Sequence, residues 1–181
     1  SKDINVKLRD TFRHTAISGV GFLKVYFDPN EGENGEIVFD QVLPTEIFTP
    51  PDLSLYGNPP VIYQVRQVDK HALAALYPEH ENTIMGSTLS AKKNPKQLAN
   101  AENDSTTVYE AWHKATASMP KGRHVICING ATLLDEEYPE KEFPFIKMDY
   151  NKPPIGYFGE GIADIIRSIQ IEINMLLVTI S

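Results

Sequence analysis

The sequence predicts an α+β fold whose strands form antiparallel sheets. Strand-like runs follow one another directly, and two Asn-Gly dipeptides, Asn34-Gly35 and Asn129-Gly130, favour hairpin turns between them. Helical periodicity is strongest near the two ends of the chain, at residues 3–17 and 162–180. Runs of strands without strict β-α-β alternation are typical of the α+β class.

The first element is predicted to be a helix within residues 1–18. Ile4, Leu8 and Phe12 recur at four-residue steps, which predicts one apolar stripe. Gly19 follows and favours the end of a helix. The chain starts with Ser1 rather than methionine, so we expect further sequence upstream.

A β-rich domain is predicted over residues 19–155. Its first two strands, 22–28 and 36–43, form a hairpin closed by Asn34-Gly35. Residues 50–60 contain four prolines and cannot form a central strand, because proline donates no hydrogen bond to a sheet. These prolines are Pro50, Pro51, Pro59 and Pro60.

The middle of this domain is predicted to contain a strand over 61–66 and then a short helix. Asp69 has the side chain to cap that helix, and Pro78 ends it. Residues 85–107 are polar and aperiodic, which predicts a long flexible surface loop. Further strands are predicted at residues 108–114, 123–128, 131–134 and 143–148.

The last 26 residues, 156–181, predict a hinge followed by a long amphipathic helix. Gly156, Gly159 and Gly161 supply the hinge, since glycine tolerates backbone conformations that other residues avoid. No glycine, asparagine or proline follows the last apolar residue, so we expect the helix to continue downstream in a longer protein.

One face of this helix is a candidate packing or subunit-contact surface. The candidate residues are Ile162, Ile165, Ile169, Gln170, Ile173, Asn174 and Leu177. Gln170 and Asn174 lie one turn apart, where amides either set the register between packed helices or simply face solvent. Further apolar residues, Ile171, Met175 and Val178, give the helix more apolar surface than one core face requires.

Composition excludes several classes of function. A net charge of −7 argues against a surface for nonspecific DNA binding, which needs clustered Lys and Arg. A single cysteine, Cys127, excludes an internal disulfide, and its apolar surroundings favour a buried, inert thiol. No apolar stretch is long enough to predict a transmembrane helix.

No catalytic residue, cofactor site or metal site is predicted. The five histidines lack the spacing of metal ligands, and the clustered acidic residues Asp135, Glu136, Glu137, Glu140 and Glu142 suit a solvated loop. The segment Gly156–Gly161 could offer backbone N–H groups to a phosphate at a helix start. However, its glycine spacing is the reverse of the dinucleotide-binding pattern, and Glu160 would repel the anion.

Several segments together resemble the portal proteins of tailed bacteriophages, particularly those of podoviruses. The resemblance covers residues 19–80 and 106–181, and residues 156–162 with 169–174 are its most specific part. The matching segments are GVGFLKV with Asp28, VLPTEIF at 42–48, VYEAW at 108–112, Pro144-Phe145, GYFGEGI at 156–162 and IQ-x-EIN at 169–174.

The resemblance implies a non-enzymatic virion protein that forms a ring, typically a homododecamer, at one capsid vertex. Double-stranded DNA would pass through its channel during packaging and genome ejection, and the large terminase subunit, capsid proteins and head–tail adaptors would bind it. On this basis residues 19–155 are the wing, and the helix after Gly156–Gly161 leads toward the stem. The expected location is the virion, with assembly in the host cytoplasm.

Two other classes of function remain open from the sequence. One is a nucleotide- or phosphate-binding enzyme domain that uses the Gly156–Gly161 segment. The other is a different oligomeric virion adaptor with a similar wing-like fold. Ring symmetry and the nature of the downstream sequence would distinguish these classes from a portal.

Overall fold

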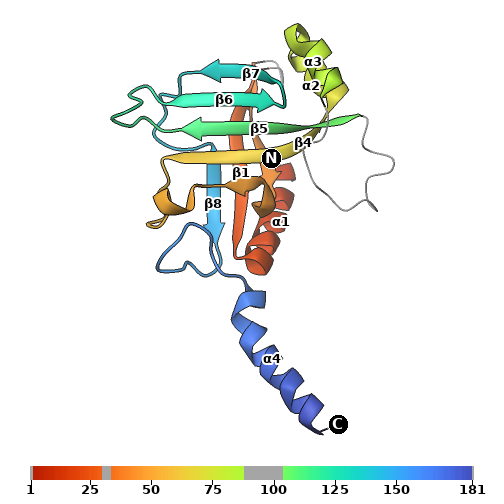
Figure 1. Ribbon diagram of the computed structural model, residues 1–181, viewed down its shortest axis with the longest axis vertical. Coiled ribbons are helices and arrows are strands. Elements are labelled where there is room, and N and C mark those ends of the chain that lie inside the picture. The colour runs from red at the N-terminus through yellow and green to blue at the C-terminus, as the bar shows by residue number, and fades with distance from the viewer. Residues whose placement is uncertain (1, 30–33, 88–103, 181) are drawn as a thin grey trace. The chain divides into compact units, whose positions relative to one another are not determined.

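The computed structural model describes residues 2–29, 34–87 and 104–180. The chain has an α+β fold, as the sequence predicts, and its described strands pair antiparallel (Figure 1). The helices are α1 (Lys2–Ser18), α2 (Lys70–Leu76), α3 (Glu81–Gly86) and α4 (Ile162–Ile180). The strands are β1 (Val20–Asp28), β2 (Glu36–Val42), β3 (Ile47–Phe48), β4 (Val61–Asp69), β5 (Ser105–His113), β6 (Arg123–Ile128), β7 (Ala131–Glu136) and β8 (Phe145–Asp149). Short 3-10 turns cover Pro44–Glu46, Pro51–Leu53 and Pro78–His80.

Backbone contacts divide the chain into two compact units. Unit 1 comprises Ser1–Thr45, Pro51–Pro59 and Pro144–Ser181, and unit 2 comprises Glu46–Pro50 and Pro60–Phe143. Unit 1 therefore contains both ends of the chain, including α1 and α4. The assignment of residues 1–18, 19–155 and 156–181 to separate functional parts stays a prediction.

Unit 1 is built on a three-stranded sheet with the order β2-β1-β8. The central strand β1 pairs with β2 through the predicted hairpin, in which Gly35 has a φ of +78°. It pairs on its other side with β8, which follows more than a hundred residues later, so that Val20 lies opposite Asp149. Phe22 and Leu23 of β1 are almost fully buried and form the core of this unit.

The helix α1 packs against this sheet through threonines. Thr11 and Thr15 are buried, and a Cβ on Gly21 of β1 would lie 2.6 Å from the backbone oxygen of Thr11. The threonine hydroxyls donate hydrogen bonds to the helix carbonyls of Lys7 and Thr11, so that neither is buried without a partner. A glycine in the strand thus allows a close approach of helix and sheet.

The predicted apolar stripe of this helix is not its buried face. Leu8 and Phe12 are 39% and 63% exposed, and Ile4 is half-buried. The physical reason is the small gap above Gly21, which accommodates a threonine but not a phenylalanine.

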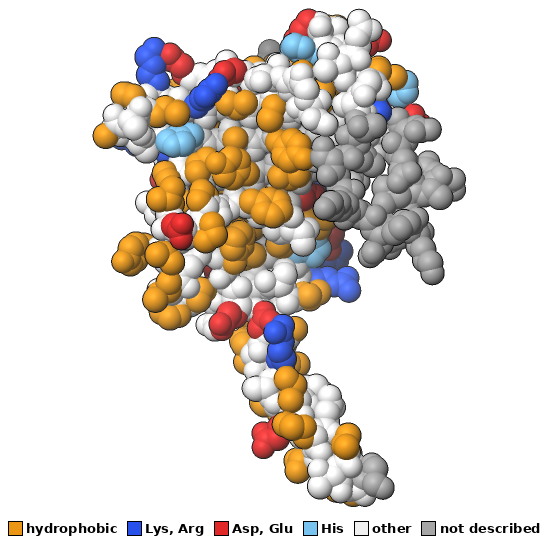
Figure 2. All heavy atoms as spheres, in the orientation of Figure 1, with side chains coloured by type: hydrophobic (Ala, Val, Ile, Leu, Met, Phe, Trp, Pro, Cys, Tyr) orange, Lys and Arg blue, Asp and Glu red, His pale blue; other side chains and the backbone are white. Residues whose placement is uncertain are grey.

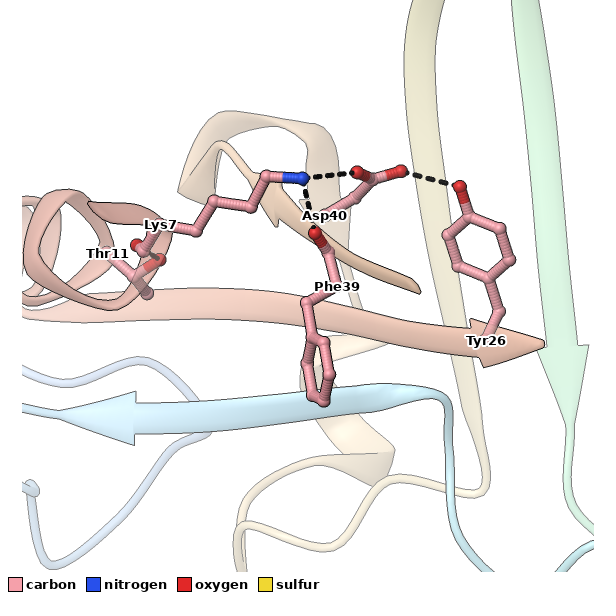
Figure 3. A network of polar contacts seen from close by, with 5 residues as sticks. All are labelled: Lys7, Thr11, Tyr26, Phe39 and Asp40. Carbon is pink, nitrogen blue, oxygen red and sulfur yellow. Dashed lines mark hydrogen bonds and ion pairs between the residues drawn. The ribbon is translucent and has the colours of Figure 1, made fainter. Parts of the chain in front are cut away.

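A polar network at the edge of unit 1 ties α1 to the β1–β2 hairpin (Figure 3). The Lys7 ammonium donates to the carbonyl of Phe39 at 2.7 Å and lies 3.3 Å from the Asp40 carboxylate. The hydroxyl of Tyr26 donates to the other oxygen of Asp40 at 2.8 Å. The Lys7–Asp40 pair is partly solvated, so we expect it to orient the helix more than to stabilise the fold.

Unit 2 is a five-stranded sheet with the order β3-β4-β5-β6-β7. Asn129-Gly130 closes the β6–β7 hairpin as predicted, with Gly130 at a φ of +99°. One face packs against the short helices α2 and α3. Its core is formed by Leu73, Ile84, Val108, Ile128 and Leu133.

The predicted cap of α2 is confirmed, because the Asp69 carboxylate accepts a hydrogen bond from the Ala72 N–H at 2.9 Å. Two elements of unit 2 were not predicted, the two-residue edge strand β3 and the helix α3. The predicted loop over residues 85–107 is wrong at its ends, since Met85 belongs to α3 and Ser105 begins β5. Its remaining residues, 88–103, lie outside the described residues.

Candidate functional site

The most unusual feature of the described chain is α4, a helix of 19 residues without a buried side chain. The predicted contact residues Ile162, Ile165, Ile169, Ile173 and Leu177 are 42–59% exposed. Apolar side chains recur along the visible side of this helix (Figure 2). An apolar helix surface of this extent is typical of a site that contacts another molecule.

The apolar residues of α4 occupy two opposite faces rather than one. At about 100° per residue, Ile162, Ile169 and Ile173 lie on one side of the helix axis, together with the rest of the predicted stripe. Ile171 and Met175 lie about 180° away from the stripe, and Val178 extends this second face. From Ile171 onward the helix can therefore contact apolar partners on two sides at once, whereas its first turns carry Asp164 and Ser168 on the second face.

Polar residues separate these two faces. Gln170 and Asn174 lie on one border, where the Gln170 amide donates to the Asn174 side-chain oxygen at 3.0 Å. Glu172 lies on the other border. These two amides thus bond each other along the helix, which leaves further donor and acceptor capacity on both side chains.

The start of α4 is capped by its own residues. The Gly161 carbonyl accepts hydrogen bonds from the N–H groups of Asp164 and Ile165 at 3.1 and 3.2 Å. The Asp164 carboxylate accepts from the Gly161 N–H at 3.4 Å and pairs with Arg167 at 2.8 Å. A carboxylate in the first turn also suits the positive end of the helix dipole.

The predicted hinge is a tight backbone junction with the end of α1. An ideal Cβ on Gly161 would lie 2.8 Å from the carbonyl carbon of Ile17, and one on Gly159 would lie 3.0 Å from the Asn151 carbonyl oxygen. The third close approach involves Gly19, at a φ of +84°, whose Cβ would lie 2.6 Å from the backbone of Glu160. These glycines fix the position at which α4 begins.

The three predicted hinge glycines differ in conformation. Gly156 has a φ of +113°, with open space around it, whereas Gly159 and Gly161 do not have positive φ. Glycine is therefore required at position 156 because of the backbone angles there. At positions 159 and 161 it is required because a Cβ atom would overlap with neighbouring backbone atoms. Sequence reasoning identified the glycines but not their partner Gly19, although the Ser18-Gly19-Val20-Gly21 segment carries a signal for close packing.

An aromatic cluster anchors the junction to the core of unit 1. The rings of Tyr157 and Phe158 lie 6.3 and 6.5 Å from the ring of Phe22, centroid to centroid. The Lys147 ammonium lies 4.4 Å from the Tyr157 centroid. Burial, and to a smaller extent the charge of Asp149, raises the pKa of Tyr157 to about 12. Sequence reasoning missed this anchor, because the role of Tyr157 depends on its packing.

Three backbone donors of the junction are already used within the protein. The N–H groups of Gly156 and Glu160 donate to the carbonyls of Leu55 and Asn151 at 2.8 and 2.9 Å. The Gly161 N–H faces the Asp164 carboxylate, as described above. This geometry does not favour phosphate binding. Within the described residues, no group of three His, Cys, Asp or Glu side chains could hold a metal ion.

A second exposed apolar surface lies on the face of the unit 2 sheet opposite to the one that packs against α2 and α3. Phe48, Tyr63 and Tyr109 are 50%, 40% and 37% exposed, and they come from the neighbouring strands β3, β4 and β5. Half-buried Val125 and Cys127 continue this face on β6, and burial raises the pKa of the Cys127 thiol. Unit 2 thus also presents apolar side chains to other molecules.

Comparison with known proteins gives no family assignment, since neither the protein-family models nor the curated proteins contain a match to this chain. Among the described helices, none combines the length and the apolar character needed to cross a membrane.

Proposed function

We propose that this chain is the wing and the upper stem of a portal protein of the tailed-bacteriophage type, and that it acts by assembly rather than by catalysis. The observation that carries the proposal is the exposure of α4 together with its two opposite apolar faces. The resemblance of residues 156–162 and 169–174 to portal proteins supports the same function.

Two apolar faces fit a ring better than a simple dimer. In a cyclic ring each subunit contacts one neighbour through one face and the other neighbour through a different face. The stripe that contains Ile169 and the face that contains Ile171 supply two such surfaces on one helix. A two-fold dimer would use one self-complementary face and leave the second exposed.

In this proposal the glycine junction is the turn between wing and stem. Close backbone packing between Gly161 and the end of α1 would hold the stem helix at a fixed point on unit 1. The ring would sit at a capsid vertex, where double-stranded DNA passes through without sequence-specific contacts. Terminase, capsid proteins and head–tail adaptors would bind other parts of the full-length protein.

Two alternatives are less well supported. A phosphate-binding enzyme domain would need free N–H groups at the junction, and those of Gly156 and Glu160 already donate within the protein. A different oligomeric virion adaptor would share the exposed helix, so it differs from a portal mainly in ring symmetry and in its downstream sequence.

The test is negative-stain electron microscopy of the protein expressed from its whole gene, with two-dimensional class averages. The proposal expects closed rings with a central hole and dodecameric symmetry. Monomers or dimers at high protein concentration would contradict it. If only these species are seen, nucleotide binding at the Gly156–Gly161 segment is the next measurement.

A further inference from the structure

His124 of β6 joins three strands of unit 2 through its imidazole ring. Its Nε2 atom lies 3.0 Å from a carboxylate oxygen of Glu110 on β5, and its Nδ1 atom lies 2.8 Å from a carboxylate oxygen of Glu136 on β7. The two ring nitrogens therefore face two different acidic side chains from the strands on either side.

The surroundings make this arrangement sensitive to charge. The side chains of Glu110 and His124 are only 6% and 13% exposed, whereas that of Glu136 is 54% exposed. The Trp112 ring stacks on the imidazole at a centroid distance of 5.2 Å and an interplanar angle of 11°. Electrostatic interactions are stronger where water is excluded, and unsatisfied polar groups are more costly there.

Other titratable groups lie near the same cluster. Tyr138, which follows β7, has its ring 6.3 Å from that of His124, and burial and then the charges of Glu140 and Glu142 raise its pKa to about 12. Burial and then the charge of Glu110 raise the pKa of Tyr77. Both tyrosines are therefore neutral near pH 7 and do not offset the two carboxylates.

The number of protons on the imidazole ring decides how many of the two carboxylates it can bind. A protonated imidazole has two N–H donors, so it can donate to both carboxylates at once. A neutral imidazole has one N–H and one lone pair, so one of its nitrogens would face an ionised carboxylate without a proton between them. Loss of one proton from the ring thus removes one of the two side-chain hydrogen bonds that the ring makes to the neighbouring strands.

We propose that His124 is a protonation-dependent clamp that holds β7 against β5 and β6. When the ring loses its proton, the remaining N–H stays with buried Glu110, and the contact with Glu136 breaks because water can solvate that more exposed carboxylate. The edge strand β7 and the segment that carries Tyr138 then loosen. This clamp lies in unit 2 and does not depend on the portal function proposed above.

The direction of the pH dependence follows from the same contacts. Burial by itself lowers the pKa of His124, but the hydrogen bonds to Glu110 and Glu136 and the charges of both residues raise it, and the net result is above the ordinary value of 6.5. The clamp therefore stabilises the fold fully below pH 6.5 and loses its effect as the pH rises through the folded-state pKa of His124.

The test uses the full chain and two NMR measurements between pH 5 and 9. The Cε1–Hε1 signals of the histidines give the titration midpoint of His124, and amide exchange gives the protection factors of β7. The clamp predicts a midpoint above 6.5 and a several-fold loss of β7 protection at that same pH. A His124 midpoint at or below 6.5, or β7 protection without a step at the midpoint, would overturn the proposal.

Two variants give the controls. Glu136→Gln keeps a side chain that can pair with either form of the ring, so it should lower the His124 midpoint and remove the step in β7 protection. The exposed His71 provides the matched control, because His71→Gln should leave both readouts as in the wild type. If Glu136→Gln shows the wild-type step, His124 is not the clamp.

Discussion

Gly161, at the start of α4, packs so closely on Ile17 that a Cβ on the glycine would lie 2.8 Å from the isoleucine carbonyl carbon. The obstructing atoms belong to the backbone at the end of α1, so no side-chain rotation can relieve the overlap. The two terminal helices of unit 1 are thus joined at a point that tolerates only glycine.

The first prediction concerns Gly161→Ala. Because the added methyl group would meet backbone atoms, we expect the free energy of unfolding to fall by about 1–3 kcal/mol, as in other overpacked sites. Urea denaturation followed by circular dichroism measures this change.

Gly86 at the end of α3 provides the matched control. A Cβ there has nothing within 4 Å, and its φ is not positive. Gly86→Ala should leave stability unchanged or raise it by up to about 1 kcal/mol, since alanine is the better helix former. Equal effects of the two substitutions would show that the junction is not tightly packed.

The elements that sequence reasoning predicted well are those with local signals. Asn129-Gly130 specifies its hairpin through the turn itself, and Asp69 caps α2 through a contact three residues away. The helix α4 was also predictable, since its apolar period extends over 19 residues.

The elements that were missed depend on contacts between distant residues. The edge strand β3 has two residues, too few for any alternation to be read, and it exists because Ile47 pairs with Gln64 of β4. The buried face of α1 could not be read from its apolar stripe, because the gap above Gly21, on a different element, decides which side chains fit. The return of β8 to β1 likewise has no local signal.

The candidate site was predictable in its residues but not in its geometry. The apolar residues of α4 and the glycines before it stand out in the sequence. The close approach of Gly161 to the end of α1 and of Gly159 to Gly19, and the burial of Tyr157 against Phe22, are properties of packing that no single segment encodes. The His124 cluster was missed because Glu110, His124 and Glu136 come from three strands.

The second prediction concerns Ile169→Asp and Ile173→Asp on the apolar stripe of α4. Both side chains are about half exposed in the single chain, at 57% and 45%, so each substitution should change the unfolding free energy of the monomer by no more than about 0.5 kcal/mol. Self-association should instead weaken at least about tenfold, because a charge would be buried in an apolar contact.

Sedimentation velocity over a range of concentrations separates the two effects. Ala163→Asp is the control, since it adds the same charge at an exposed position on the polar border of the helix that Gln170 and Asn174 form. If Ala163→Asp and Ile169→Asp weaken association equally, the stripe does not form the contact. If neither the wild type nor the variants associate, the role of α4 in assembly is contradicted for this chain.

The third prediction concerns the alkaline stability of unit 1. Burial, followed by the charge of Asp149, raises the pKa of Tyr157 to about 12, from an ordinary value of 10.0. The unfolded chain therefore ionises this tyrosine more readily than the folded chain. The stabilisation is complete below pH 10 and is lost as the pH rises from about 10 to about 12, with a total loss of roughly 2–3 kcal/mol.

Tyr157→Phe removes this group, and its ring can still pack on Phe22. We expect the variant to lose less stability than the wild type between pH 9 and pH 11.5, as measured by urea unfolding at each pH. Tyr138 also has a pKa raised to about 12, so Tyr138→Phe should give a separate and additive reduction of the pH dependence. If the unfolding free energy of Tyr157→Phe falls between pH 9 and pH 11.5 as steeply as that of the wild type, the Tyr157 hydroxyl is solvated. The aromatic anchor of the junction would then be looser than the packing of Tyr157 on Phe22 implies.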